Sequence, residues 1–150
     1  MLDTLFISVH IPAGLIAVGA GLVAMFARKG AWWHRKGGMV YLYAIFAVAT
    51  TAAGLVATRG FQFAPLLVVG LLAATLAYWG YRSRRTHQKY HILGMGTSYI
   101  AMLTAFYVDN GPKLPFWEMF PGWSFWILPS LIGLPIVGRA IARRGWRCIG

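Results

Sequence analysis

Acidic residues are the scarcest chemical feature of this sequence. The chain of 150 residues contains only Asp3, Asp109 and Glu118 as acids, and charged residues of both signs make up 11% of it. Soluble proteins carry roughly a quarter charged residues. A chain of this length also forms a core too small to bury a 59% hydrophobic composition. The composition therefore excludes a water-soluble domain and predicts that lipid covers much of the apolar surface.

Cysteine is almost absent as well. Cys148 is the only one, so a disulfide framework within the chain is excluded. Its position near the end of the chain gives no motif for a reactive thiol.

Long apolar segments are abundant. A helix needs roughly 20 apolar residues to cross the hydrocarbon layer, and its backbone must be hydrogen-bonded within the segment. We therefore expect an all-α polytopic membrane protein, a single transmembrane domain over residues 1–150 with five transmembrane helices in a bundle. The segments free of charge place these helices at about 5–27, 37–58, 60–81, 91–109 and 122–140.

The basic residues, which give the chain a net charge of +11, gather in three places between or after the expected helices. Only Arg59 and Lys113 fall on the opposite side, so the positive-inside rule predicts an outer N-terminus and a cytoplasmic C-terminus. Anionic lipid headgroups are the expected partners of this basic face, and no nucleic acid is needed to explain it. The three clusters are Arg28, Lys29, Arg35 and Lys36; Arg82, Arg84, Arg85 and Lys89; and Arg139, Arg143, Arg144 and Arg147.

A short internal similarity links the first two inner turns. Each turn is basic and ends in an aromatic residue, a histidine, two further residues and a glycine, at 33–37 and at 90–94. This predicts two helical hairpins related by an axis along the membrane normal. His34 and His91 are then expected to face each other at one depth.

The histidines are the candidate cofactor ligands. His87 and His91 are four residues apart, a spacing that predicts one helical face, which Met95 extends. Together with His34 they would form a metal site of three imidazoles at the cytoplasmic edge. Two facing histidines, His34 and His91, also suit a haem b, with Arg35 placed to pair with a propionate. Such a protein would serve electron transfer or sensing.

A role without any cofactor is equally open, because histidine and arginine at an interface also contact headgroups and helix ends. An enzyme is the weakest hypothesis, although it is left open. No Ser or Glu accompanies the inner histidines as nucleophile or base, and no Glu follows the first His as in zinc proteases.

His10 lies inside the first expected helix, and an ionisable group there is a functional hypothesis by default. Its expected partners lie on the outer side, with Asp109 first among them. This pair predicts an alternative function, a small-solute transporter or a proton relay. A histidine that only hydrogen-bonds a neighbouring helix is the other interpretation.

Small residues recur every four positions on the first two helices, at Ala13, Ala17 and Gly21 and at Ala49, Ala53 and Ala57. This spacing predicts close helix approach in lipid. It does not distinguish packing within one chain from a homo-oligomer.

Several motifs together resemble a family of small multi-pass bacterial membrane proteins classed as a domain of unknown function. The resemblance covers nearly the whole chain and implies a location in the bacterial cytoplasmic (inner) membrane, but no activity. The motifs are His34-Arg35-x-Gly37 with Tyr41, the pair His87 and His91, the run from Gly94 to Tyr99, and the run from Thr104 to Gly111.

Overall fold

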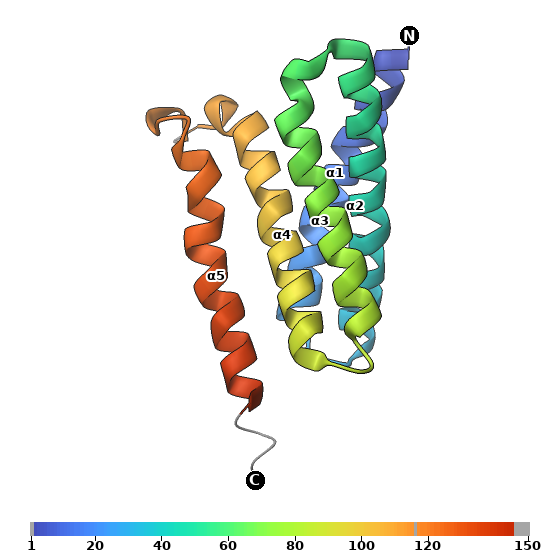
Figure 1. Ribbon diagram of the computed structural model, residues 1–150, viewed down its shortest axis with the longest axis vertical. Coiled ribbons are helices and arrows are strands. Elements are labelled where there is room, and N and C mark those ends of the chain that lie inside the picture. The colour runs from blue at the N-terminus through green and yellow to red at the C-terminus, as the bar shows by residue number, and fades with distance from the viewer. Residues whose placement is uncertain (1, 116, 146–150) are drawn as a thin grey trace. The chain divides into compact units, whose positions relative to one another are not determined.

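The computed structural model describes residues 2–115 and 117–145, with side chains except at 118, 144 and 145. Arg147 and Cys148 lie outside the described residues. Over the described ranges all regular structure is helical, so the all-α part of the expected fold class is confirmed (Figure 1). The α-helices are α1 (Leu2–Phe26), α2 (Trp32–Arg59), α3 (Ala64–Ser83), α4 (Gln88–Asn110) and α5 (Ser124–Gly145), and the 3-10 helices are η1 (Phe61–Phe63), η2 (Gly111–Lys113) and η3 (Trp117–Met119).

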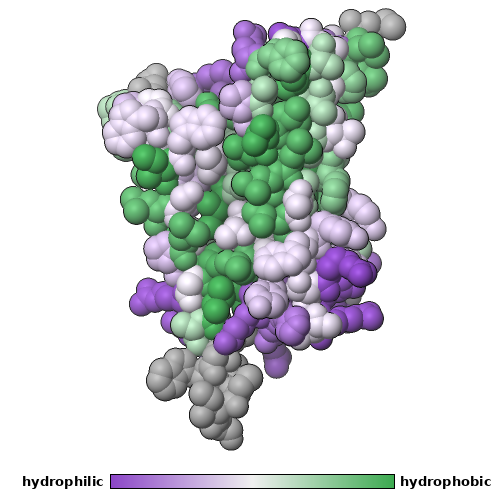
Figure 2. Space-filling model, in the orientation of Figure 1, coloured by the Kyte–Doolittle hydropathy of each residue, from purple (hydrophilic) through white to green (hydrophobic). Residues whose placement is uncertain are grey.

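Each of the five α-helices is long and apolar enough to cross a membrane, as the sequence predicts. Large apolar side chains are exposed along them, which a soluble protein avoids but lipid accommodates. Figure 2 shows hydrophobic side chains along the middle of the helices and the most hydrophilic ones toward helix ends. Exposed examples are Leu15, Ile16, Val68, Leu131 and Ile132.

The helices differ from the apolar segments at their ends. α2 begins at Trp32 and not at 37, and α4 begins at Gln88 and not at 91. Charged and aromatic residues form the added turns, because a charge-free segment marks only the apolar part of a helix and not its ends. Between α2 and η1 the chain turns at Gly60, whose φ of 103° favours glycine.

The contacts divide the chain into two compact units, Met1–Ala74 and Thr75–Gly150, which are described separately. In the first unit α1 and α2 form an antiparallel hairpin whose turn contains Gly30 at a φ of 83°. The hairpin packs through small residues. A Cβ on Gly54 would lie 2.6 Å from the Phe6 ring, so that ring packs directly on the α2 backbone at a position where only glycine leaves room.

The small-residue pattern is confirmed on α1 and only partly on α2. Ala13, Ala17 and Gly21 are all buried. On α2, Ala49 is buried, whereas the alanines at 53 and 57 are exposed. A period of four residues drifts around a helix that has 3.6 residues per turn, so a long stripe leaves the interface.

The second unit contains the end of α3 together with α4 and α5. α4 and α5 pack by inserting side chains over glycines: Val137 lies against Gly96, and Ile100 against Gly133. In the connection between them, Trp117 stacks near Tyr107 at 5.1 Å and near Phe120 at 5.7 Å between ring centroids. The connection thus brings aromatic rings together beside the end of α4.

Candidate functional site

His34 is fixed by the end of the preceding helix. It occupies the first turn of α2, and its Nδ1 lies 2.8 Å from the carbonyl oxygen of Ala24 near the end of α1. A carbonyl oxygen only accepts, so Nδ1 carries the proton and donates it. In this tautomer the lone pair is on Nε2, the atom through which the ring would coordinate a metal.

Gly37 makes this contact geometrically accessible. A Cβ at this position would lie 3.1 Å from both the Ala20 oxygen and the Ala24 nitrogen on α1. The missing side chain therefore lets the first turns of α2 approach the last turns of α1. That approach brings the Ala24 carbonyl within reach of the His34 ring.

His91 has the same environment in the second unit. Its Nδ1 lies 2.9 Å from the carbonyl oxygen of Gly80 on α3, so it also donates from Nδ1 and keeps the lone pair on Nε2. A Cβ on Gly94 would lie 2.6 Å from the Gly80 Cα and 2.9 Å from the Leu76 oxygen. The two backbones therefore touch.

The two hairpins thus repeat one local geometry. A shift of 57 residues carries His34 onto His91 and Gly37 onto Gly94, and both pairs keep their roles. A shift of 56 carries Ala24 onto Gly80, the residues whose carbonyls accept these bonds. The repeat extends further along the second helix of each hairpin. Equivalent positions there are buried: Tyr41 and Ser98, Leu42 and Tyr99, Ile45 and Met102.

His87 does not lie on the helical face expected for it. It is the N-cap of α4, with extended dihedrals, and its side chain makes no cap hydrogen bond. Its exposed ring lies 5.3 Å from that of Tyr90. The spacing of four residues still appears in the backbone, where the N–H of His91 bonds the His87 oxygen at 3.1 Å. Helix initiation after His87 explains the difference.

Arg35 and Met95 flank the two central histidines. Arg35 follows His34 in the first turn of α2 and is exposed. Met95 lies one turn after His91 and is half-buried, and its backbone nitrogen forms part of the close contact with Gly80. Arg35 is therefore adjacent to His34 in the chain, and Met95 lies one helical turn from His91.

No group of three or more His, Cys, Asp or Glu side chains in the described part of the chain is arranged to hold a metal ion. The three-imidazole site of His34, His87 and His91 gains no support from this geometry. Ligation by two histidines needs no such group, and it remains a prediction.

His10 contacts the neighbouring helix. Its Nδ1 lies 2.8 Å from the hydroxyl oxygen of Thr51 on α2, which is buried. The Thr51 hydroxyl is itself 2.7 Å from the Ala47 oxygen, to which it donates, so the His10 ring donates to Thr51. This is the helix-to-helix polar contact of the second interpretation given above for His10.

Asp109 lies exposed in the last turn of α4. The next residue, Asn110, donates from its side chain to the Phe106 oxygen at 3.0 Å and so bonds the end of the helix. Asp109 belongs to the second unit and His10 to the first. A relay through the two therefore stays a prediction.

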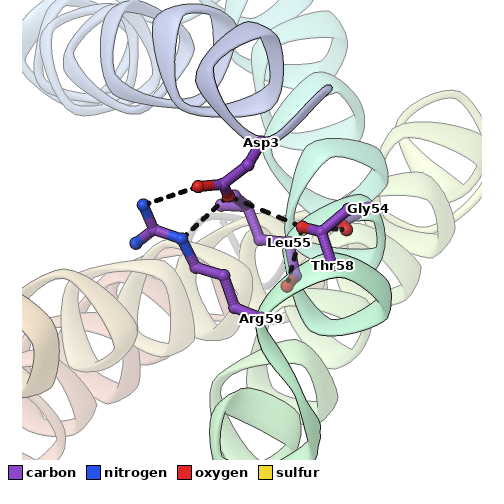
Figure 3. A network of polar contacts seen from close by, with 5 residues as sticks. All are labelled: Asp3, Gly54, Leu55, Thr58 and Arg59. Carbon is purple, nitrogen blue, oxygen red and sulfur yellow. Dashed lines mark hydrogen bonds and ion pairs between the residues drawn. The ribbon is translucent and has the colours of Figure 1, made fainter. Parts of the chain in front are cut away.

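The ion pair between Asp3 and Arg59 was not predicted from the sequence. Asp3 at the start of α1 receives two hydrogen bonds from Arg59 at the end of α2, at 2.8 and 3.0 Å (Figure 3). Thr58 lies 3.5 Å from the same carboxylate. Opposite charges at the two open ends of a hairpin were the available signal, since antiparallel helices place these ends together.

In comparisons with known proteins, no family model, no curated protein and no solved structure matches this chain. The resemblance drawn from the motifs therefore stays an expectation, and function has to be argued from the residues.

Proposed function

We propose that this chain is a multi-pass protein of the bacterial cytoplasmic membrane, with its N-terminus outside, that binds haem b or a transition metal through His34 and His91. The site would lie at the cytoplasmic edge and serve electron transfer or sensing. One observation carries the proposal: each hairpin holds a histidine by the same bond from Nδ1 to a carbonyl of the preceding helix.

This bond is the usual support of a metal-binding imidazole. Histidine ligands almost always donate their other ring N–H to a carbonyl or carboxylate, which fixes the tautomer and the orientation of the ring. For both His34 and His91 the bond selects Nε2 as the coordinating atom. A histidine used only to contact headgroups gains nothing from a fixed tautomer, whereas a ligand does.

Two neighbouring residues have roles in this proposal. The exposed guanidinium of Arg35 can pair with a haem propionate by charge-assisted hydrogen bonds. Met95, one turn after His91, adds a soft, polarisable side chain near that ring. A haem or copper ion bound there would supply one-electron redox chemistry. The chain itself would supply two oriented imidazoles and a cationic side chain.

An absorption spectrum of the detergent-purified protein, before and after dithionite, tests the proposal. Cells supplied with haem should yield a protein with a Soret band that shifts and sharpens on reduction. A spectrum without that band, together with metal analysis that finds no stoichiometric transition metal, would refute the proposal.

Substitution by asparagine separates ligation from structural support. Asn places an N–H donor near the position of Nδ1 and has no atom at Nε2. His34→Asn and His91→Asn should therefore keep the bond to the carbonyl and the thermal stability but lose the cofactor. Alanine at either position should lose the cofactor and also the bond to the carbonyl. Loss of that bond should lower the free energy of unfolding by about 1 kcal/mol. If the asparagine variants retain the spectrum or the metal, these histidines are not the ligands.

A further inference from the structure

The turn between α1 and α2 concentrates positive charge, and only Lys29 among its described cations bonds the end of α1, at the Ala24 and Met25 oxygens. No acid occurs between residues 4 and 108 of the sequence, and Asp3 is engaged by Arg59. Arg28 and Lys36 are exposed, and over the described residues no carboxylate lies within ion-pair distance of either. Among the described residues, no carboxylate therefore balances the charge of Arg28 and Lys36.

Two exposed indoles lie within the same turn. Trp32 is 53% and Trp33 64% exposed, and the two rings meet edge to face at 4.6 Å between centroids. The ammonium of Lys36 lies 6.0 Å from the Trp32 ring centroid, so its charge stays beside the aromatic surface. Indoles favour the level of the lipid headgroups. The indoles and the cations are thus joined in one exposed surface, which we name the first-turn surface: Arg28, Trp32, Trp33, Arg35 and Lys36.

The equivalent turn of the second hairpin is arranged differently. Arg84 stacks on the Tyr81 ring at 3.6 Å and donates to the Tyr81 oxygen at 2.7 Å. Part of its charge is therefore used by its own helix end, as is that of Lys29 in the first turn, whose ammonium donates to the Ala24 and Met25 oxygens. In addition, Arg84 covers an aromatic ring. At the positions equivalent to Trp32 and Trp33 this turn has Lys89 and Tyr90, and the Tyr90 ring lies 5.6 Å from that of Trp79 on the preceding helix. The two turns therefore have similar numbers of cations, but only the first presents them beside two adjacent exposed tryptophans.

We propose that the first-turn surface binds the phosphodiester headgroup of an anionic phospholipid more tightly than the turn between α3 and α4 does. The cations supply charge and hydrogen-bond donors for the phosphate, and the indoles hold the turn at headgroup depth. A free phosphate ion would use the cations but not the indoles, so the paired tryptophans favour the lipid. The proposal uses the membrane location proposed above and is independent of any haem or metal.

Native mass spectrometry of the detergent-purified chain, titrated with phosphatidylglycerol or with phosphatidylcholine, tests this directly. The double variant Arg28→Gln and Lys36→Gln leaves Arg35 and both histidines intact. Because each cation near a lipid surface contributes about 1 kcal/mol, its affinity for phosphatidylglycerol should fall about tenfold or more. The matched variant, Arg84→Gln and Arg85→Gln, removes the same charge and should lose less, because Arg84 already stacks on Tyr81 and bonds its own helix end.

Five controls decide the outcome. Equal loss in both double variants would overturn the proposal, because net charge alone would then explain binding. Equal retention of phosphatidylcholine, or displacement of the lipid by excess inorganic phosphate, would overturn it as well. Trp33→Leu should weaken lipid retention at unchanged charge, and unaltered retention counts against the indoles. His34→Asn, which tests the cofactor, should leave lipid binding intact, so the two proposals fail separately.

Discussion

The two hairpins reach the same histidine geometry with different closeness of their helices. In the first, the histidine-bearing helix packs Gly37 against α1 at Ala24. In the second, Gly80 and Gly94 oppose each other, and a Cβ on either would come within 2.7 Å of the partner backbone. The bonds from Nδ1 to the carbonyl are nevertheless 2.8 and 2.9 Å. The histidine contact is thus maintained while the helix separation varies, which argues that the contact is the feature under constraint.

The hairpins also differ in polarity away from the turns. The first contains the pair of His10 and Thr51, and the equivalent positions in the second are the apolar Leu66 and Val108. Of the two histidine contacts in the first hairpin, the one near the turn is repeated in the second and the one at His10 is not. The contact of His10 with Thr51 occurs in one hairpin, which is typical of a contact that stabilises that hairpin alone. The histidine-to-carbonyl bond occurs in both, as expected if the two histidines take part in one site.

The largest expected effect comes from filling the closest helix contact. Gly94→Ala places a methyl group 2.6 Å from the Gly80 Cα, where only backbone movement relieves the clash. It should destabilise the protein by about 3 kcal/mol, the upper range of overpacking. Gly37→Ala places its methyl group 3.1 Å from the α1 backbone and should cost about 1 kcal/mol. The cost is smaller than at Gly94 because the contact is less close and the higher helix propensity of alanine offsets part of it. Thermal unfolding in detergent, followed by circular dichroism, measures both.

Gly38→Ala is the matched control, since nothing lies within 4 Å of a Cβ there. It should unfold at the wild-type temperature or slightly above. Equal destabilisation by Gly94→Ala and Gly37→Ala would contradict the inference that the helices approach more closely at Gly94 than at Gly37.

Composition and charge spacing were enough to predict the helices, because lipid imposes one backbone solution on a long apolar segment. Their ends were less predictable, because Trp32 to Lys36 are polar or interfacial and still helical. The repeat of His34 and His91 was visible as a pattern in the sequence. Their partners were not, because a carbonyl of Ala24 or Gly80 carries no signal in residue type.

His10 shows the same limit from another side. The sequence predicted that this half-buried histidine has a polar partner, and it favoured acids on the outer side. The partner in the first unit is Thr51, a residue whose hydroxyl usually bonds its own helix. Without the register of α1 against α2, one threonine cannot be distinguished from its neighbours.

An intermediate effect is expected from the polar pair of the first hairpin. Thr51→Val removes the acceptor of the His10 Nδ1–H and should cost about 1 kcal/mol, since hydrogen bonds between membrane helices average about 0.6 and reach about 1.7. Thr50→Val is the matched control, because the Thr50 hydroxyl bonds the Phe46 oxygen of its own helix. Thermal unfolding of both variants provides the comparison.

A double-mutant cycle tests whether the pair acts as a unit. In the background of His10→Leu, Thr51→Val should cost clearly less than in the wild type. Additive losses would show that the 2.8 Å contact contributes nothing, and the first hairpin would then differ from the second in sequence alone.

The smallest effect is expected at the open end of the first hairpin, where Arg59 and Asp3 form an exposed ion pair. Such pairs lose side-chain entropy and are screened by salt, so Asp3→Asn should lower the melting temperature only slightly, and only at low ionic strength. Exchanging the charges, with Asp3→Arg and Arg59→Asp together, should restore what either single change loses. A large loss that persists in high salt would mean that Asp3 holds the start of α1 through Thr58 as much as through Arg59, and Thr58→Val would then reproduce it. The first hairpin would in that case depend on a polar contact at its open end as well as on its glycine contact at the turn.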